Sequence, residues 1–440
     1  MVIQPDADRR APSGIDRAAV AQLADERLDW RFKALPPAAR GLTVAEYLAT
    51  GPTLDDFGTP LLTLDARAVA HNLHTMAAWC AEAGVRLAPH GKTTMAPALW
   101  QAQLDAGAWA ITLANLPQLR VARAFGVQRL LLANSLLDPA GLGWLAGELD
   151  ADPRFSFSSW VDSVESVRLM DRALRATGRP PGARPVDVLV ELGGPGGRTG
   201  VRDLATALEV ARAVAAAPTL RLTGLGGYEG ALAHDATATG LGTVEEYLGR
   251  LVELHGLLLA EDLFAEAEEV VVTAGGSAYF DQVARVLVPL AEAHRDTAVV
   301  IRSGAYLVHD DGFYRGISPL ARGAGAEPLR SAMHGWARVV SRPEPELALL
   351  DGGKRDFPYD EGLPEPQSVR GGGPLTGAVT AVNDQHAFLR GAGDLAPLGA
   401  VLRLGLSHPC TAFDKWTLIP VLDDAELPNP RVVGLVRTFF

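Results

Sequence analysis

Three kinds of residue in this chain could do chemistry: a lysine after an apolar segment, several glycine-rich turns, and a histidine–cysteine pair. Lys92 stands in the run His90-Gly91-Lys92-Thr93, directly after the short apolar segment 85–89. A lysine at the exit of a buried strand loses hydration, which favours the neutral, nucleophilic amine. Such an amine could form a Schiff base with a carbonyl group. The alternative is an ordinary solvated lysine at a strand–helix corner.

Two glycine-rich turns could bind a phosphate group. Ala274-Gly275-Gly276-Ser277 and Ser303-Gly304-Ala305-Tyr306 each follow an apolar segment late in the chain. Barrel enzymes commonly bind phosphate after strands seven and eight, through glycine-exposed amides and a helix N-terminus. A nucleophilic lysine together with such a phosphate site predicts pyridoxal phosphate as cofactor. Ordinary loop glycines are the alternative.

Other predicted strand ends carry groups that could contact this cofactor. Arg198 and Thr199 follow a glycine-rich turn, Tyr228 follows a second one, and His90 precedes the lysine by two residues. Arg198 could hold a carboxylate or a ring atom of the cofactor, or it could be solvated. Arg198 and Tyr228 are both candidates for the partner of the pyridine nitrogen.

A metal could bind near the C-terminus, at Ser407-His408-Pro409-Cys410. His408 and Cys410 would point the same way from an extended segment, and this ligand pair suits zinc. Two protein ligands would leave positions open for water and substrate, as in a catalytic site. Gln385 and His386 are candidates for substrate contact, and His386 could also be a third group at the metal. A hydrogen-bonded loop histidine is the alternative.

These residues need a scaffold, and the chain repeats a unit of short apolar strand, loop and amphipathic helix. Eight strands that alternate with helices predict a (β/α)8 TIM barrel, whose active site lies at the carboxyl ends of the strands. No Gly-x-Gly-x-x-Gly turn follows the first strand, which disfavours an open doubly wound sheet. The predicted strands are Arg86–Pro89, Ala110–Ala114, Arg129–Ala133, Phe155–Val161, Asp187–Glu191, Arg221–Gly224, Val270–Thr273 and Val299–Arg302.

The flanking sequence differs from the repeating part. After Tyr306 helical periodicity fades, and short β-branched runs separated by proline and glycine predict an all-β domain. The predicted domains are an N-terminal extension at 1–57, a barrel at 58–306 and a β domain at 307–440. A lead-in strand near Leu61 could pair with the β domain or cap the barrel.

Composition limits the classes of function. A net charge of −12 without a basic cluster argues against nucleic-acid binding, and no apolar run is long enough to span a membrane. Only two cysteines, and no apolar signal-peptide core, predict a cytoplasmic protein without disulfides. An anionic small molecule is still a possible ligand, because a local cationic pocket can lie on an acidic protein.

The motifs together resemble the fold-type III pyridoxal-phosphate enzymes, and more narrowly the D-serine dehydratase / D-threonine aldolase group of amino-acid deaminases. The resemblance runs from about Thr59 to the C-terminus. It depends on Pro89-His90-Gly91-Lys92-Thr93, Arg198-Thr199-Gly200, Tyr228-Glu229-Gly230, Gly275-Gly276-Ser277, Arg302-Ser303-Gly304-Ala305-Tyr306 and His408-Pro409-Cys410.

The resemblance implies an alanine-racemase-like barrel followed by a β domain, with Lys92 bound to the cofactor and zinc on His408 and Cys410. It also implies a homodimer. Aldolases of this group tend to have aspartate where this chain has Cys410, which favours the dehydratase side. The chain departs from the group at Ala88 and at Thr94-Met95, where arginine and a His-Lys pair are usual. These departures bear on the substrate's side chain and not on the cofactor.

The predicted activity is a lyase that converts D-3-hydroxy amino acids such as D-serine to a 2-keto acid and ammonia, with pyridoxal phosphate and zinc as cofactors. One alternative is retro-aldol cleavage to glycine and an aldehyde by the same groups. An alternative of another class is a non-catalytic barrel that only carries pyridoxal phosphate, against which the β domain argues.

Overall fold

The computed structural model describes residues 14–180, 182–323 and 327–440. Contacts between residues divide the chain into two compact units. The barrel unit contains the described residues up to Asp16, Ala77–Lys92 and Gln103–Gly304. The β unit contains Arg17–Met76, Thr93–Ala102 and the described part of Ala305–Phe440. The predicted domain limits at residues 57 and 306 stay a prediction.

The barrel unit is built on eight parallel strands in the order β2-β9-β8-β7-β6-β5-β4-β3. An isolated parallel bridge between His90 and Thr112 joins the two ends of this sheet, so the strands curl into a barrel. The predicted fold is confirmed. The strands are β2 (Arg86–Leu87), β3 (Ile111–Leu113), β4 (Arg129–Leu132), β5 (Ser156–Val161), β6 (Val186–Leu192), β7 (Leu220–Gly227), β8 (Val270–Ala274) and β9 (Thr297–Ile301).

The strand limits agree with the predicted ones or differ from them by up to three residues. The predicted first strand ran to Pro89, but β2 ends at Leu87. Proline has no N–H to donate, so the regular ladder stops beside it. Hydrogen bonding to β9 nevertheless continues on either side of the proline, through Ala88 N to Ile301 O at 2.8 Å and His90 N to Arg302 O at 3.2 Å. These two bonds hold the segment that leads to Lys92.

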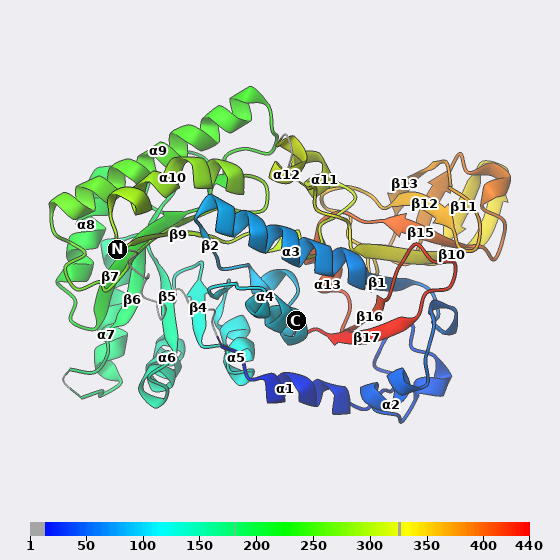
Figure 1. Ribbon diagram of the computed structural model, residues 1–440, viewed down its shortest axis with the longest axis horizontal. Coiled ribbons are helices and arrows are strands. Elements are labelled where there is room, and N and C mark those ends of the chain that lie inside the picture. The colour runs from blue at the N-terminus through cyan, green and yellow to red at the C-terminus, as the bar shows by residue number, and fades with distance from the viewer. Residues whose placement is uncertain (1–13, 181, 324–326) are drawn as a thin grey trace, which may run out of the picture. The chain divides into compact units, whose positions relative to one another are not determined.

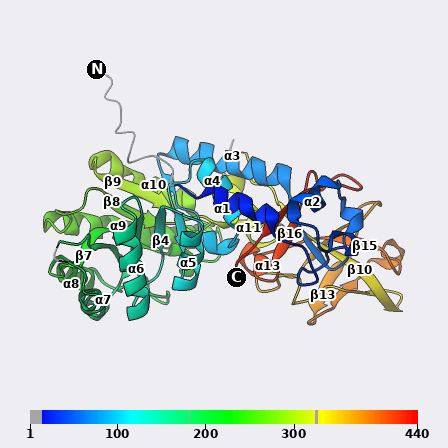
Figure 2. The ribbon, with the colours of Figure 1, turned by 90° about the horizontal axis from the view of Figure 1, so that it is seen from below.

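Helices α5–α10 lie outside the strands, as Figures 1 and 2 show. Side-chain caps begin five of the long helices, at Asn115, Asp138, Ser163, Asp203 and Thr237, each accepting a backbone N–H in the first turn. The long helices of the chain are α3 (Ala66–Ala83), α4 (Pro97–Asp105), α5 (Leu116–Ala124), α6 (Pro139–Ala151), α7 (Val164–Ala176), α8 (Leu204–Ala215), α9 (Ala238–Ala260) and α10 (Phe280–Ala293).

The barrel interior is filled by side chains, so it is a packed core and not a pore. Trp109 and Trp160 are the largest members of this cluster, and aliphatic residues such as Leu131 and Leu189 surround them. Because side chains fill the interior, a ligand would bind at the loops that follow the strands and not inside the barrel.

The β unit contains a nine-stranded sheet. β1 pairs antiparallel with β10 and parallel with β16, so the lead-in strand belongs to this sheet and does not cap the barrel. The strands are β1 (Leu61–Asp65), β10 (Met333–Glu344), β11 (Leu347–Leu350), β12 (Glu365–Val369), β13 (Ala378–Val382), β14 (Ala387–Arg390), β15 (Val401–Gly405), β16 (Leu418–Leu422) and β17 (Val432–Arg437).

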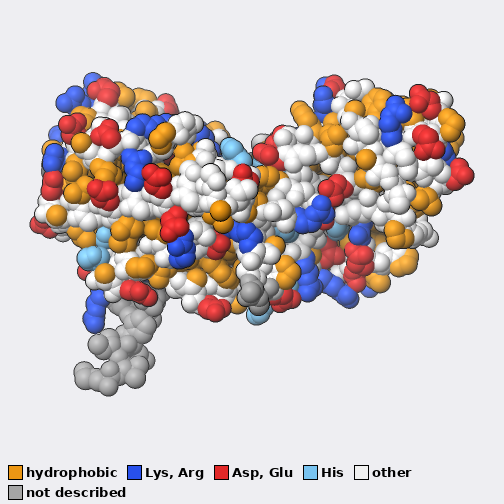
Figure 3. Space-filling view, turned by 90° about the horizontal axis from the view of Figure 1, so that it is seen from above, with side chains coloured by type: hydrophobic (Ala, Val, Ile, Leu, Met, Phe, Trp, Pro, Cys, Tyr) orange, Lys and Arg blue, Asp and Glu red, His pale blue; other side chains and the backbone are white. Residues whose placement is uncertain are grey.

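Short helices occupy the loops. The short α-helices are α1 (Arg17–Ala21), α2 (Val44–Ala49), α11 (Phe313–Ile317), α12 (Pro319–Arg322) and α13 (Pro409–Phe413). The 3-10 helices are η1 (Gln22–Asp25), η2 (Pro37–Ala39), η3 (Leu54–Asp56), η4 (Gly91–Thr93), η5 (Glu229–Ala231), η6 (Ala305–Leu307) and η7 (Gly393–Leu395). Among the described residues, no helix is both long and apolar enough to cross a bilayer. On the face shown in Figure 3, acidic and basic side chains are interspersed.

Candidate active site

Lys92 lies in η4, which begins four residues after β2 ends, and its side chain is partly buried. The sequence holds only four lysines, and the other three (Lys33, Lys354 and Lys415) belong to the β unit. Lys92 is therefore the one lysine in the barrel unit. The strand-exit position predicted for it agrees with the structure.

His90 lies beside the lysine and is held by its backbone. Burial lowers the pKa of its imidazole well below the ordinary value, and the positive charges of Lys92, Arg302 and Arg198 lower it further. The ring is therefore neutral at physiological pH. No described residue hydrogen-bonds its buried Nδ1 atom. A buried polar atom usually has a partner, so a ligand in this place is a simple way to supply one.

Arg302, directly after β9, is a buried cation of the barrel that received no role from the sequence. Only 2% of its surface is exposed. Its guanidinium donates to Thr273 Oγ1 and to Gly227 O, both at 2.6 Å, and lies over the Trp160 ring. Burial lowers the pKa of Arg302, which the negative charge of Glu229 opposes. Its Nε atom has no hydrogen-bond partner among the described residues.

The loop after β6 brings together two of the predicted cofactor contacts. The Arg198 guanidinium lies 4.5 Å from the centre of the Tyr228 ring, a cation–π contact. Thr199 donates its hydroxyl to Glu191 Oε1 at 2.9 Å. Burial raises the pKa of Glu191, a carboxylate at the end of β6. Arg198, Thr199 and Tyr228 also line one small cavity together with Glu191.

A carboxylate holds the glycine turn that was predicted to bind phosphate. Glu229 is fully buried, and its two oxygens accept the backbone N–H groups of Gly275 and Gly276, each at 2.8 Å. On the other side of the turn, Ser303 Oγ donates to Gly276 O at 2.9 Å. A phosphate bound at this loop would therefore have to displace Glu229 or use other donors.

The remaining predicted phosphate contacts lie close along the chain. Ser277 follows the glycine pair, Gly304 follows Ser303 at the end of the barrel unit, and Tyr306 is a buried residue of η6. The roles of Gly275, Gly276, Ser277, Gly304 and Tyr306 toward phosphate stay predictions.

Pyridoxal phosphate fits the residues at the carboxyl ends of the barrel strands. The barrel unit offers a single lysine there, two arginines that carry positive charge, and an unfilled imidazole nitrogen on His90. An anionic, aromatic aldehyde needs a lysine, cations and polar contacts of this kind.

The predicted metal ligands lie in the β unit, after β15. His408 has a left-handed backbone (φ 54°), which is uncommon for a residue other than glycine. Asp310 Oδ2 accepts the His408 backbone N–H at 3.0 Å and stabilises this conformation. Burial opposes the charged form of the His408 imidazole, but the Cys410 sulfur and Asp360 outweigh it and raise the pKa to about 9. The His408 and Cys410 side chains are therefore in contact. The predicted extended segment is wrong, because Cys410 lies in α13 (Pro409–Phe413) and the left-handed His408 precedes that helix.

Asp360 orients the His408 ring. His408 Nδ1 lies 2.5 Å from Asp360 Oδ2, and Thr411 donates its hydroxyl to the other oxygen, Oδ1, at 2.7 Å. An ionised carboxylate only accepts, so Nδ1 carries a proton. Because the pKa is raised, the ring also keeps its second proton on Nε2, and a metal at Nε2 would displace that proton. Metal-binding histidines are typically held in this way. Cys410 Sγ donates to Thr93 Oγ1 at 3.5 Å, and Thr93 is the residue after Lys92 in the chain.

The pair fits a borderline or soft metal ion with open coordination positions. In the part of the chain that the structure describes, no three His, Cys, Asp or Glu side chains form a metal cluster. His386 therefore does not join His408 and Cys410 in this chain. It lies exposed in the turn before β14, where Gln385 donates to Asp356 Oδ2 at 3.1 Å. Contact of Gln385 and His386 with substrate stays a prediction.

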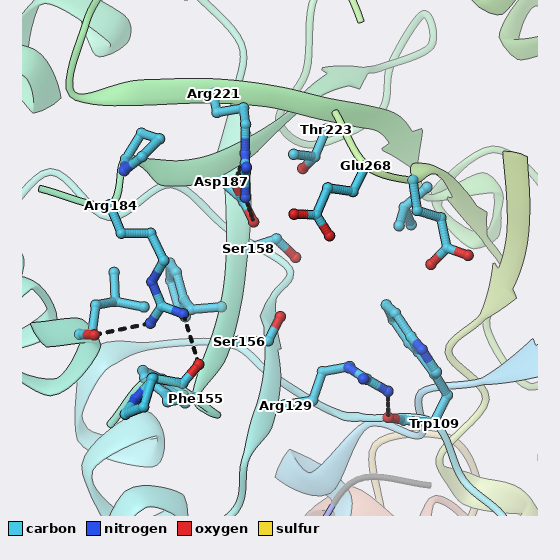
Figure 4. Close-up of a pocket in the computed structure, with 16 residues that line it drawn as sticks. Trp109, Arg129, Phe155, Ser156, Ser158, Arg184, Asp187, Arg221, Thr223 and Glu268 are labelled. Carbon is cyan, nitrogen blue, oxygen red and sulfur yellow. Dashed lines mark hydrogen bonds and ion pairs between the residues drawn. The ribbon is translucent and has the colours of Figure 1, made fainter. Parts of the chain in front are cut away.

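A larger cavity of about 570 Å³ lies at the amino ends of the barrel strands (Figure 4). Its charged groups largely satisfy one another. Arg221 donates to Asp187 at 2.7 Å, and Arg184 donates to the carbonyl oxygens of Pro153 and Leu149. Active sites of TIM barrels lie at the opposite end of the strands. We therefore assign this cavity no role in the chemistry.

Comparison with known proteins supports the same assignment. Residues 64–280 match the family model "Alanine racemase, N-terminal domain", and residues 332–422 match "Putative serine dehydratase domain". D-threonine aldolase of Arthrobacter sp is 30% identical over 392 residues, which cover 89% of this chain and 96% of that protein. 3-Hydroxy-D-aspartate aldolase of Paracoccus denitrificans (strain Pd 1222) is 25% identical over 329 residues, which cover 74% and 80%.

A solved structure shares the fold over nearly the whole length. D-threo-3-hydroxyaspartate dehydratase from Delftia sp. HT23 superimposes with a TM-score of 0.70 at 23% identity, covering 88% of this chain and 99% of that one. The fold thus defines an alanine-racemase-like barrel followed by a β domain. The chain belongs to the fold-type III pyridoxal-phosphate enzymes, in the family that includes D-threonine aldolase, and it is a lyase. The alternative of a non-catalytic carrier is set aside.

Proposed function

We propose that the protein is a pyridoxal-phosphate- and zinc-dependent dehydratase that converts D-3-hydroxy amino acids, such as D-serine, to 2-keto acids and ammonia. The observation that carries this proposal is the contact between His408 and Cys410, with Asp360 holding Nδ1 so that Nε2 is the nitrogen that would bind a metal once its proton is displaced. A thiolate and an imidazole favour zinc over harder ions.

Lys92 would hold the cofactor covalently, because it is the only lysine of the barrel unit. When bound, pyridoxal phosphate withdraws electrons from Cα of the substrate. The Lys92 amine would also be the base that removes the Cα proton of the bound substrate. Arg198 and Arg302 supply positive charge at the same ends of the strands, and the neutral His90 can hydrogen-bond without adding charge.

His408 and Cys410 would hold the metal, which as a Lewis acid would make the β-hydroxyl a better leaving group. Elimination then needs no strong protein acid beside the hydroxyl. Asp360 and Thr411 keep the imidazole in one orientation, so the metal would stay in one place relative to the β unit.

Retro-aldol cleavage is the second candidate, because both curated relatives described above are named as aldolases. It would use the same lysine and metal but would break Cα–Cβ after the β-hydroxyl lost its proton. The two reactions differ in their products and not in the residues they require.

A product assay distinguishes the two reactions. The holoenzyme with zinc is incubated with D- and L-serine, D- and L-threonine and both enantiomers of 3-hydroxyaspartate, and the products are identified by mass spectrometry. Keto acid and ammonia from D-isomers alone would support the dehydratase. Glycine and an aldehyde would show the aldolase. The absence of both products from all six compounds would refute the substrate class.

We also propose that the enzyme is a homodimer, as its resemblance to the group implies. Multi-angle light scattering on the holoenzyme at several concentrations is the test. A mass of one chain at every concentration would contradict it.

A further inference from the structure

Three of the four lysines in the chain line one cavity of about 630 Å³ in the β unit. These are Lys33, Lys354 and Lys415, and Arg355 is a fourth cation in the lining. The chain has 40 lysine and arginine residues, so lysine is rare and arginine is its usual cation. The convergence of rare lysines is independent of the barrel and of the metal pair. The lysines come from the segment before β1, the turn after β11 and a position two residues after the end of α13.

A buried carboxylate organises one side of this cavity. Asp356 is 3% exposed and accepts hydrogen bonds from Gln385 Nε2 at 3.1 Å and from the Gly353 N–H at 3.2 Å. Lys33 Nζ lies 3.2 Å from Asp356 Oδ1 and 2.8 Å from Arg355 O. Lys33 therefore neutralises the one acidic side chain in the lining.

The other three cations of the lining, Lys354, Arg355 and Lys415, are not neutralised by an acidic side chain of the cavity. Arg355 and Lys415 each pair with an acidic side chain outside the lining, Asp384 and Asp414, at 3.3 Å. Both acids are exposed, and such surface pairs contribute little, about 0 to 1 kcal/mol. Lys354 lies over the Tyr359 ring and makes no described salt bridge. A ligand with two negative charges could thus replace weak contacts by stronger ones.

The backbone fixes the positions of these cations. Lys354 N donates to Asn383 O at 2.9 Å, and Arg355 N donates to Asp384 O at 3.2 Å. At Gly353 the two turns approach so closely that a Cβ would lie 2.3 Å from Asn383 O. The backbone at Lys354 and Arg355 is therefore held by two turns bonded to each other, while Lys33 and Lys415 come from other segments.

We propose that this cavity is a binding site for a small dianion, a dicarboxylate or a phosphate compound, built from other residues than Lys92, Arg198 and Arg302. The ammonium group of lysine is a compact charge with three rotatable donors, which suits carboxylate and phosphate oxygens that arrive in varied directions.

The test is calorimetric titration of the holoenzyme, whose barrel site is already filled by its cofactor. Malonate and inorganic phosphate are the probes, and acetate at the same ionic strength is the monoanion control. We expect one malonate or phosphate per chain. The double variant Lys354→Gln/Lys415→Gln should bind at least about tenfold more weakly. Binding of malonate alone would identify the dicarboxylate class, and binding of phosphate alone the phosphate class.

Two matched variants keep the result interpretable. Lys354→Arg/Lys415→Arg retains the charges and should bind far better than the glutamine pair. Arg168→Gln removes an exposed cation of α7 in the barrel unit and should leave the affinity unchanged. An unchanged cofactor absorbance shows that each variant is folded. Failure of both dianions to bind, or equal affinity in the glutamine pair and the native protein, would overturn the proposal.

Discussion

Replacing Glu229 by glutamine removes one negative charge from the interior of the barrel unit at almost constant volume. Glu229 is fully buried and accepts the N–H groups of Gly275 and Gly276, one on each oxygen. A glutamine can accept only one of these bonds, because its other terminal atom is an amide nitrogen that donates. One buried N–H would then face another donor.

The expected loss in the free energy of unfolding can be worked out from these contacts. An unsatisfied buried donor costs about 1–3 kcal/mol. The remaining bond changes from charge-assisted to neutral, and the buried Arg302 loses a compensating charge. Loss of a partner beside a buried ion adds destabilisation of up to about 3–5 kcal/mol. Since Arg302 keeps its own bonds to Thr273 and Gly227, we expect a total loss of about 2–5 kcal/mol in the free energy of unfolding.

Urea unfolding followed by tryptophan fluorescence measures this loss, with matched concentrations of cofactor. Glu245→Gln is the control, because Glu245 and its partner Arg285 are both about half exposed and their pair contributes about 1 kcal/mol or less. A Glu229→Gln variant no less stable than the control would refute the argument that this carboxylate holds the glycine turn.

Three further changes have outcomes that the structure specifies. Asp360→Asn should weaken zinc binding by about 10- to 100-fold, measured by competition with a chromophoric chelator, because an uncharged side chain with one accepting oxygen cannot hold both the His408 ring and the Thr411 hydroxyl. Burial lowers the pKa of His255 to about 4, so the free energy of unfolding should decline as pH falls from 6.5 to 4, by up to about 1.4 kcal/mol per unit. His255→Gln should flatten that slope in urea unfolding. Gly227→Ala should lower the thermal midpoint, because its Cβ would overlap the Tyr247 hydroxyl.

Each of these changes has a control. Asp384→Asn removes an exposed carboxylate and should leave zinc affinity unchanged. Because the pKa of His255 is lowered, its contribution to stability is complete above pH 6.5 and is lost toward pH 4. If the free energy of unfolding declined equally with falling pH in the native protein and in His255→Gln, His255 would not contribute to the acid effect. Gly147→Ala lies in α6 with open space around it and should maintain or raise the thermal midpoint.

The barrel and its lysine were predictable because their signals are local. Segments such as 129–133 and 270–273 are apolar on both faces, which only a strand covered on both sides requires. Lys92 lies just beyond such a segment, so its place at a strand exit follows from chain order alone. His408 and Cys410 are two residues apart, so their proximity follows from chain order. The left-handed His408 and the helix at Cys410 were not predicted.

Contacts between distant residues were not predictable in this way. Asp360 lies 48 positions before His408, in a loop with no periodic pattern. Glu229 accepts hydrogen bonds from backbone amides 46 and 47 positions later in the chain, and Lys33 bonds to Asp356, which is 323 positions away. No local propensity encodes such pairs, since they depend on how strands and turns pack in three dimensions. The sequence named Glu229 only as part of a motif and could not assign it the glycine turn.

We propose that Lys92 is the residue that binds pyridoxal phosphate covalently. The most direct measurement is reduction of the holoenzyme with borohydride, proteolysis, and mapping of the pyridoxyl group by mass spectrometry. Because the chain has four lysines, every possible site can be followed in one experiment. We expect label on Lys92 and loss of the cofactor's visible absorbance in Lys92→Ala. Label on Lys33, Lys354 or Lys415 in place of Lys92, or unchanged absorbance in the variant, would contradict it.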